Sequence, residues 1–152
     1  MNSQQQALLN LERYLPYRLS ILSNKVSTLV AQTYKDKFAI SITEWRIMAV
    51  LGEYPGASAD EISSKTQIEK SLISRAISQL LKRKLIERQV SKEDKRRSHI
   101  CLSKTGYEVY ADIVPLSYDY EQKLLACLQP EEQAQLSDII DRLYQHAERL
   151  DF

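Results

Sequence analysis

Several residue types on which enzymes, metalloproteins and secreted domains depend are scarce in this 152-residue chain. Its two cysteines, Cys101 and Cys127, are too far apart to indicate a disulfide framework. Its two histidines, His99 and His146, have no Asp, Cys or Ser partner at a recognisable motif spacing, and three glycines leave no phosphate-binding glycine loop. We therefore expect no enzymatic activity, no metal site and no cofactor.

Long apolar runs are also missing. No stretch approaches the roughly 20 residues that a membrane-spanning helix needs, and residues 1–4 lack the start of a signal peptide. These observations predict a cytoplasmic protein without membrane contact. Few Gly and Pro residues among abundant Leu, Ile, Ala, Gln, Glu, Lys and Arg favour a mainly α protein.

Charge is nearly balanced overall but unevenly distributed. The net charge is +1, yet the segment from Lys65 to Lys104 holds twelve basic and four acidic residues, while the remainder holds nine basic and sixteen acidic residues. A neutral chain with a strongly basic middle third indicates one surface suited to a polyanion. The acidic flanks must serve another purpose.

The basic segment begins with the pattern of a helix-turn-helix. Ser58, with Glu61 three residues later, predicts the capped start of a short helix that ends near residues 66–67. An earlier short helix is predicted from Thr43 as its N-cap, with Trp45 as a core anchor. A further helix follows from residue 70, and its apolar positions recur every three or four residues. They are Leu72, Ile73, Ala76, Ile77, Leu80 and Leu81.

The opposite face of that last helix is small, polar and cationic. It carries Ser71, Ser74, Arg75, Ser78 and Lys82. Arg75 can pair with a guanine edge or hold a phosphate, and the serines let the helix approach the major groove. Lys82 and Arg83 are predicted to contact phosphates. A solvated surface helix without a ligand is the alternative interpretation of this face.

Two short alternating segments, 85–90 and 98–102, enclose the charged stretch 91–97 and predict a β-hairpin. A helix-turn-helix followed by such a hairpin is a winged helix. Arg96 at the hairpin tip is suited to a narrow minor groove, and Lys92, Lys95 and Arg97 to phosphates. Asp94 would be repelled by DNA, so we expect it to pair with an arginine and hold the shape of the wing.

Long amphipathic helices are predicted on both sides of the winged helix. Leu8, Leu15, Leu22 and Leu29 stand seven residues apart, with Pro16 expected to kink or restart their helix. After the wing, Ser103 is predicted to cap a helix that Pro115 bends or breaks, and Pro130 to begin the last helix. The expected organisation is a helical dimerisation region, 1–36 and 104–152, around a winged helix-turn-helix DNA-binding lobe, 37–103.

The sequence resembles the MarR family of bacterial transcriptional regulators over roughly residues 11–150. The most specific match is residues 94–106, which are similar to the family's wing signature of Asp-x-Arg followed by Leu-Ser/Thr and Gly. Residues 43–48, 72–75 and 81–86 support it, although Lys84 stands where the family usually has Gly. The resemblance implies a homodimer with interlocking terminal helices that binds a palindromic operator, and we expect a repressor. It also implies that Asp94 salt-bridges a neighbouring basic side chain.

Many members of that family loosen from DNA when a small, often aromatic, molecule or an oxidant acts on them. Tyr14, Tyr17, Arg18, Tyr107 and Tyr110 are the candidate lining of an effector pocket, although aromatic residues at helical spacing more often belong to a core or an interface. Two alternatives stay open. One is a thiol redox-sensing regulator, although neither cysteine lies in the first helix, where the peroxide-sensing members keep theirs. The other is a protein-interaction module that does not bind DNA.

Overall fold

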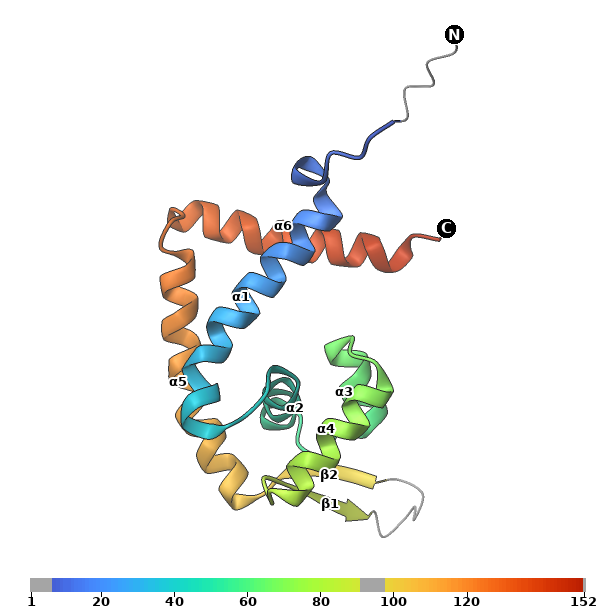
Figure 1. Cartoon of the computed structure of the whole chain (residues 1–152), viewed down its shortest axis with the longest axis vertical. Helices are drawn as coiled ribbons and strands as arrows, with labels where there is room; N and C mark the ends of the chain where they lie inside the picture. Colours follow the sequence, from blue (N-terminus) through green and yellow to red (C-terminus); the bar gives the residue numbers. More distant parts are fainter. Residues whose placement is uncertain (1–6, 91–97, 152) are drawn as a thin grey trace. The chain divides into compact units, whose positions relative to one another are not determined.

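The computed structural model describes residues 7–90 and 98–151 (Figure 1). Its elements in chain order are a 3-10 helix η1 (Leu11–Arg13), α1 (Leu15–Phe38), α2 (Ile42–Glu53), α3 (Ala59–Thr66), α4 (Lys70–Lys82), β1 (Ile86–Val90), β2 (Ser98–Leu102), α5 (Lys104–Leu125) and α6 (Pro130–Arg149). The prediction of a mainly α chain with a winged helix-turn-helix is confirmed. Two compact units are present, Met1–Val114 and Pro115–Phe152.

Hydrogen-bonded caps set the starts of the short helices. The Ser41 hydroxyl accepts the Glu44 N–H at 3.1 Å, and the Glu44 carboxylate accepts the Ser41 N–H at 3.1 Å. The prediction of Thr43 as this cap is therefore wrong, because only a side chain three residues before Glu44 can complete the reciprocal pair. The Ser58 cap is confirmed, since its hydroxyl accepts the Glu61 N–H at 3.1 Å.

Two prolines have different effects on the long helices. Pro16 is the second residue of α1, which begins at Leu15 instead of near Leu8, so this proline starts the helix. Pro115 lies inside α5, which runs without interruption from Lys104 to Leu125. Of the bend or break expected at Pro115, the break does not occur, because a helix that is long on both sides can tolerate the loss of one backbone donor.

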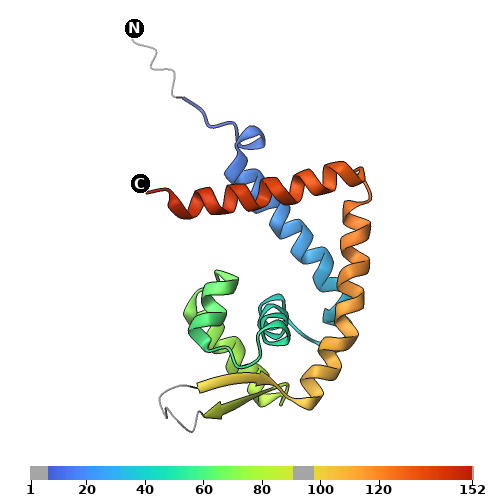
Figure 2. The same cartoon turned by 180° about the vertical axis from the view of Figure 1, so that it is seen from behind.

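The core of the first unit lies where α2, α3 and α4 pack together above the two strands (Figures 1 and 2). Each of the three helices and the strand β2 contributes fully buried side chains. They are Ile47, Met48, Leu51, Ile62, Ile73, Ile77, Leu80 and Ile100, and outside these elements Tyr34, Ile40 and Ile113 are fully buried as well. Because the core draws one face from each helix, it fixes which face of α4 points outward.

An aromatic row joins α1 and α5 to this core. The ring of Trp45 lies 5.8 Å from that of Tyr34 and 5.9 Å from that of Tyr110, between ring centroids. Trp45 is half-buried and packs against the core, as its predicted role as an anchor requires. Tyr34 is buried, and its burial raises the pKa of the phenol above its ordinary value of 10.0 even though nearby Arg46 lowers it.

The β-hairpin is antiparallel, with Ile86 opposite Leu102 and Val90 opposite Ser98. Ala57 forms an additional bridge to Ile100, which ties the turn after α2 to the hairpin. The turn from α4 into β1 places Lys84 at φ +58°, the left-handed conformation that usually selects glycine. The N–H of Lys84 bonds to the Leu81 carbonyl at 3.0 Å, so the turn is that of a normal helix end.

The second unit exposes its apolar side chains. No residue of α6 is buried, although its apolar positions repeat every three or four residues. The exposed positions are Leu136, Ile139, Ile140, Leu143 and Tyr144. Within the described ranges 7–90 and 98–151, no helix combines the length and apolarity needed to cross a bilayer.

Candidate nucleic-acid interface

The outward face of α4 is the centre of the candidate interface. Ile73, Ile77 and Leu80 hold the inner face in the core. All five predicted contact residues of this helix are exposed together on the other side. They are Ser71, Ser74, Arg75, Ser78 and Lys82. No acidic residue lies within α4, so nothing on this face of the helix repels a polyanion.

Leu72 departs from the predicted inner face. Its side chain is 47% exposed and, with Arg75 and Gln79, lines a cavity of about 200 Å³ against the start of α2. At about 100° per residue, Leu72 falls at the edge of the stripe whose middle is Ile73 and Leu80. The apolar periodicity of α4 therefore includes one residue, Leu72, that the core does not bury.

The turn between α3 and α4 is built without the glycine often found there. Gln67 takes the left-handed conformation at φ +58°, and its side-chain amide donates to the Ser64 carbonyl at 2.6 Å. The Thr66 hydroxyl donates to the Ile62 carbonyl at 2.7 Å, and the Ser63 hydroxyl to the Ile68 carbonyl at 2.7 Å. These bonds within the turn fix how α4 follows α3.

Arg83 is held within its own chain. Its guanidinium donates to the carbonyls of Ala39 at 2.8 Å and Phe38 at 2.7 Å. These carbonyls, at the end of α1, are strong acceptors for a cation. The phosphate contact expected of Arg83 stays a prediction.

The predicted wing contacts, Asp94, Lys95, Arg96 and Arg97, lie outside the described residues, as does Lys92. Both strands that lead to them are described and form the hairpin. Gly106, at the end of the signature, is buried so closely that a Cβ there would collide with the Leu85 carbonyl.

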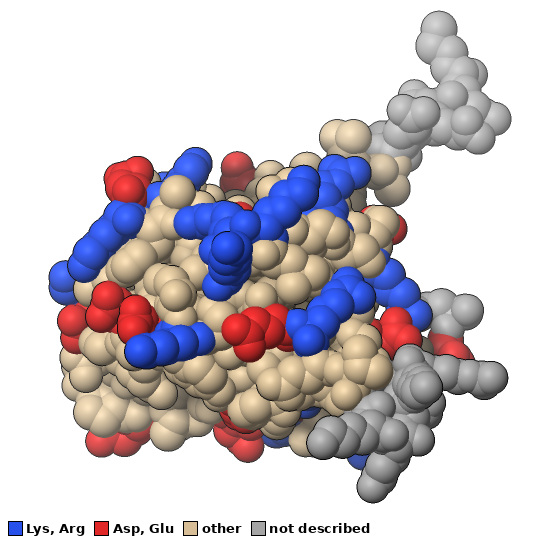
Figure 3. All heavy atoms as spheres, turned by 90° about the horizontal axis from the view of Figure 1, so that it is seen from below, with Lys and Arg blue, Asp and Glu red and all other residues tan. Residues whose placement is uncertain are grey.

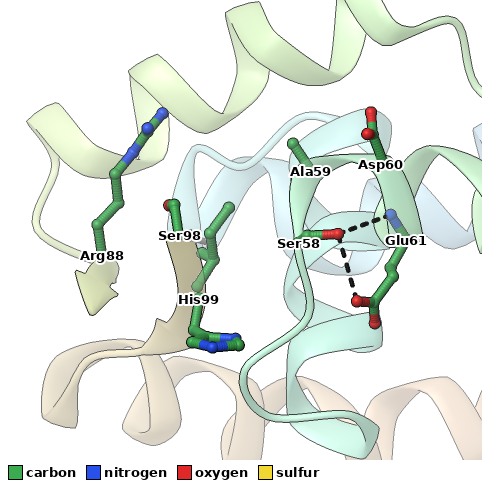
Figure 4. Close-up of a pocket in the computed structure, with 8 residues that line it drawn as sticks. Ser58, Ala59, Asp60, Glu61, Arg88, Ser98 and His99 are labelled. Atoms are coloured by element: carbon green, nitrogen blue, oxygen red, sulfur yellow. Dashed lines mark hydrogen bonds between the residues drawn. The ribbon is translucent and has the colours of Figure 1, made fainter. Parts of the chain in front are cut away.

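Arg88 on β1 is an exposed cation beside the wing that the sequence reasoning did not single out. Figure 4 shows it rising from its strand on one side of a cavity of about 500 Å³, with Asp60 and Glu61 on the opposite side. On the same cavity, His99 Nδ1 lies 2.9 Å from the Gly56 carbonyl oxygen. The sequence did contain a signal for Arg88. It lies among the alternating residues of 85–90, and every second residue of a strand shares a face.

Seen from the side of the β-hairpin, the surface carries Lys and Arg side chains with Asp and Glu side chains interspersed among them (Figure 3).

Known proteins share both the sequence and this arrangement. A model of the MarR family matches residues 40–97. The crystal structure of a MarR/EmrR family transcriptional regulator from Acinetobacter sp. ADP1 is 30% identical, with a TM-score of 0.86 over 93% of this chain and 100% of that one. The chain belongs to the MarR family.

Two further transcriptional regulators are similar to this chain. The HTH-type transcriptional regulator BilQ of Clostridium symbiosum is 27% identical over 116 residues, covering 76% of this chain and 81% of that protein. The PcaV transcriptional regulator from Streptomyces coelicolor, solved with its natural ligand, shares the fold at 22% identity and a TM-score of 0.78, over 93% of this chain and 99% of that one. The protein is thus a MarR-family transcriptional regulator with a winged helix-turn-helix fold.

The effector-pocket candidates of this MarR-family regulator fall into two groups. Tyr14, Tyr17 and Arg18 are exposed at the start of α1, while Tyr107 is exposed and Tyr110 half-buried on α5. Tyr110 belongs to the aromatic row that includes Trp45 and Tyr34. Tyr34 lies 17 residues after Tyr17, which places it about 26 Å further along α1. The structure does not bring the two groups together within one chain.

The two thiols also lie in different surroundings. Cys101 is half-buried on β2 opposite Glu87, and Cys127 is exposed just after α5. Over the described ranges of the chain, no group of three or more His, Cys, Asp or Glu residues could hold a metal ion.

Proposed function

We propose that this MarR-family regulator binds double-stranded DNA sequence-specifically, with α4 in the major groove. The observation that carries the proposal is the outer face of α4, exposed, rich in serine and free of acids, on a helix whose inner face is anchored in the core. An α-helix fits the major groove, where each base pair presents a distinct pattern of donors and acceptors.

Each exposed side chain of α4 has a chemical role in this proposal. Arg75 presents a planar fork of donors to a guanine edge. The Ser78 hydroxyl already donates to the Ser74 carbonyl at 3.1 Å, so towards DNA it is an acceptor. Lys82 binds a phosphate and orients the helix without reading sequence.

The wing supplies the second group of contacts. Arg96 enters the minor groove, Lys95 and Arg97 bind phosphates, and Asp94 holds the hairpin shape. Arg88, exposed on the described strand β1, adds positive charge next to these residues.

The regulator acts as a homodimer on a palindromic operator. Support comes from the exposed apolar side chains of two helices, Leu15, Leu19 and Leu22 on α1 and Ile140 and Leu143 on α6. Exposed stripes of this kind need a partner. Two copies would place two α4 helices about one turn of DNA, ~34 Å, apart. Occupying an operator in the cytoplasm is the simplest way to repress transcription.

The decisive experiment selects bound sequences from a random duplex pool and measures affinity against salt. We expect a palindromic sequence and a fall in affinity of about 10³- to 10⁵-fold between 50 and 200 mM salt, as for six to ten phosphate contacts. Failure to bind any duplex at low salt would favour the alternative of a protein-interaction module.

Arg75→Ala tests base reading. We expect binding to the selected operator to weaken by about 1–3 kcal/mol and the base preference to relax at one position of each half-site. Lys82→Ala is the matched control, since it removes one positive charge from the same helix. It should weaken selected and random duplexes alike. An equal loss on both duplexes for Arg75→Ala would make Arg75 a phosphate contact only.

We further propose that a small aromatic effector releases the regulator from DNA. Tyr14, Tyr17, Arg18, Tyr107 and Tyr110 remain its candidate residues. Titrating phenolic carboxylates into the operator complex tests it, and binding that does not change over the series would count against an effector of this class. A ligand that does release DNA must, by linkage, bind free protein more tightly than the complex.

A further inference from the structure

Three helices of the first unit meet at one side chain. Arg83, directly after α4, donates to the carbonyls of Phe38 and Ala39 at the end of α1, at 2.7 and 2.8 Å. Its guanidinium also lies 4.0 Å from the Glu44 carboxylate at the start of α2. The donor and its acceptors are 44 and 45 residues apart in sequence, so this is a tertiary contact.

The chemistry of this junction suits arginine in particular. The final carbonyls of a helix lack partners along the chain and carry the negative end of its dipole. Two of them lie side by side here because Ala39 turns into the left-handed conformation at φ +53°. A planar guanidinium can donate to both at once, whereas a lysine ammonium acts as a single point charge.

The backbone of Arg83 is itself held firmly. Leu80, three residues earlier, is fully buried. The next residue, Lys84, bonds to the Leu81 carbonyl through its N–H and accepts the Ser103 hydroxyl on its own carbonyl at 2.7 Å. The guanidinium therefore connects α1 to a rigid end of the recognition helix.

The other contacts that hold α1 against this lobe also lie in its second half. Its buried residues there are Ala31 and Tyr34, and Val30 and Phe38 pack against the core. Further towards its start, Arg46 donates a hydrogen bond of 3.0 Å to Ser27. Residues 15–25 are exposed throughout, so their direction depends on how the far end of α1 is held.

We propose that Arg83 is a positioning residue that sets the angle between α1 and α4, and thereby the separation of the two recognition helices in the dimer. The inference rests on the proposed function, in which α1 joins the two copies and α4 reads DNA. The separation of two half-site readers decides which half-site spacing an operator must have. Arg83 would then determine spacing specificity without touching DNA.

The test is Arg83→Ala, measured on a series of duplexes that keep both selected half-sites and vary the spacer by one base pair either way. We expect the preference for the original spacing over the altered ones to fall by about 5- to 10-fold, in the range of an ordinary coupling between sites. Arg83→Lys, which keeps the charge but loses the fork, should show a smaller loss of the same kind. It also replaces the alanine variant if thermal melting shows that variant to be unfolded.

Lys82→Ala is again the matched control, because it removes the adjacent positive charge and leaves the junction intact. It should weaken binding at every spacing equally and reduce the salt dependence by about one phosphate contact. The same pattern in Arg83→Ala would overturn the proposal and return Arg83 to the role of a phosphate contact, as would an unchanged spacing preference. If the wild-type protein selects no duplex, the proposed function itself fails.

Discussion

The helices of the winged-helix lobe and the last helix, α6, are all amphipathic. The lobe buries its apolar faces, whereas α6 leaves its apolar face exposed. Ile77 in α4 is 1% exposed, whereas Ile140 in α6 is 55% exposed. The lobe satisfies its apolar faces within the chain because three helices and a hairpin converge on one core. The apolar face of α6 is left for another surface, which is the physical basis for expecting a dimer.

The same two regions also differ in charge. The helix α4 has no acid, while α6 carries Glu131, Glu132, Asp138, Asp141 and Glu148. The exposed residues of α4 thus attract a polyanion, and those of α6 repel it. An apolar face that is exposed on an acidic helix indicates a protein partner, and a polar face that is exposed on a basic helix indicates DNA.

The largest effects are expected from the same substitution made in each region. Ile77→Ala should lower the free energy of unfolding by about 2–5 kcal/mol at every protein concentration, because it leaves a cavity in a closed core. The matched change Ile140→Ala should act through association, so its effect should depend on protein concentration. Urea unfolding at two concentrations measures both. A loss at Ile140 that did not vary with concentration would mean that α6 is stabilised within its own chain.

A smaller effect is expected at the turn that ends α4. Lys84 has a φ of +58°. This conformation is unfavourable for a residue that has a Cβ, and glycine avoids that cost in free energy. Lys84→Gly should therefore raise stability by about 0.5–1 kcal/mol, measured by urea unfolding. Lys104→Gly, in the first turn of α5, is the control and should lower stability instead. No gain at Lys84 would show that its side chain compensates for the strain.

The smallest effect should appear only at high pH. Burial favours the neutral phenol of Tyr34 and raises its pKa above 10.0, although Arg46 opposes this. Below pH 10 the phenol is neutral in both folded and unfolded chains, and above it the unfolded chain loses its proton first. Stability should therefore decrease as pH rises beyond 10, and less so in Tyr34→Phe. Equal slopes in the two proteins, in unfolding curves from pH 8 to 11, would contradict the prediction.

Local signals in the sequence predicted most of the lobe. The Ser58 cap, the α4 periodicity and the alternation on either side of the wing predicted elements that the structure contains. The error in the cap of α2 has a local physical cause. Ser41 and Thr43 are both acceptable caps by residue type, and only the reciprocal bond with Glu44 distinguishes them.

By itself, the sequence determined the element order and the polar face of α4, because helix periodicity and capping act over a few residues. The tertiary structure alone decided where Arg83 and Leu72 lie. The position of the Arg83 side chain depends on carbonyls more than 40 residues away in the sequence. The position of Leu72 depends on how α2 packs against α4. Such contacts arise only when separate elements pack, so no local pattern in the chain encodes them.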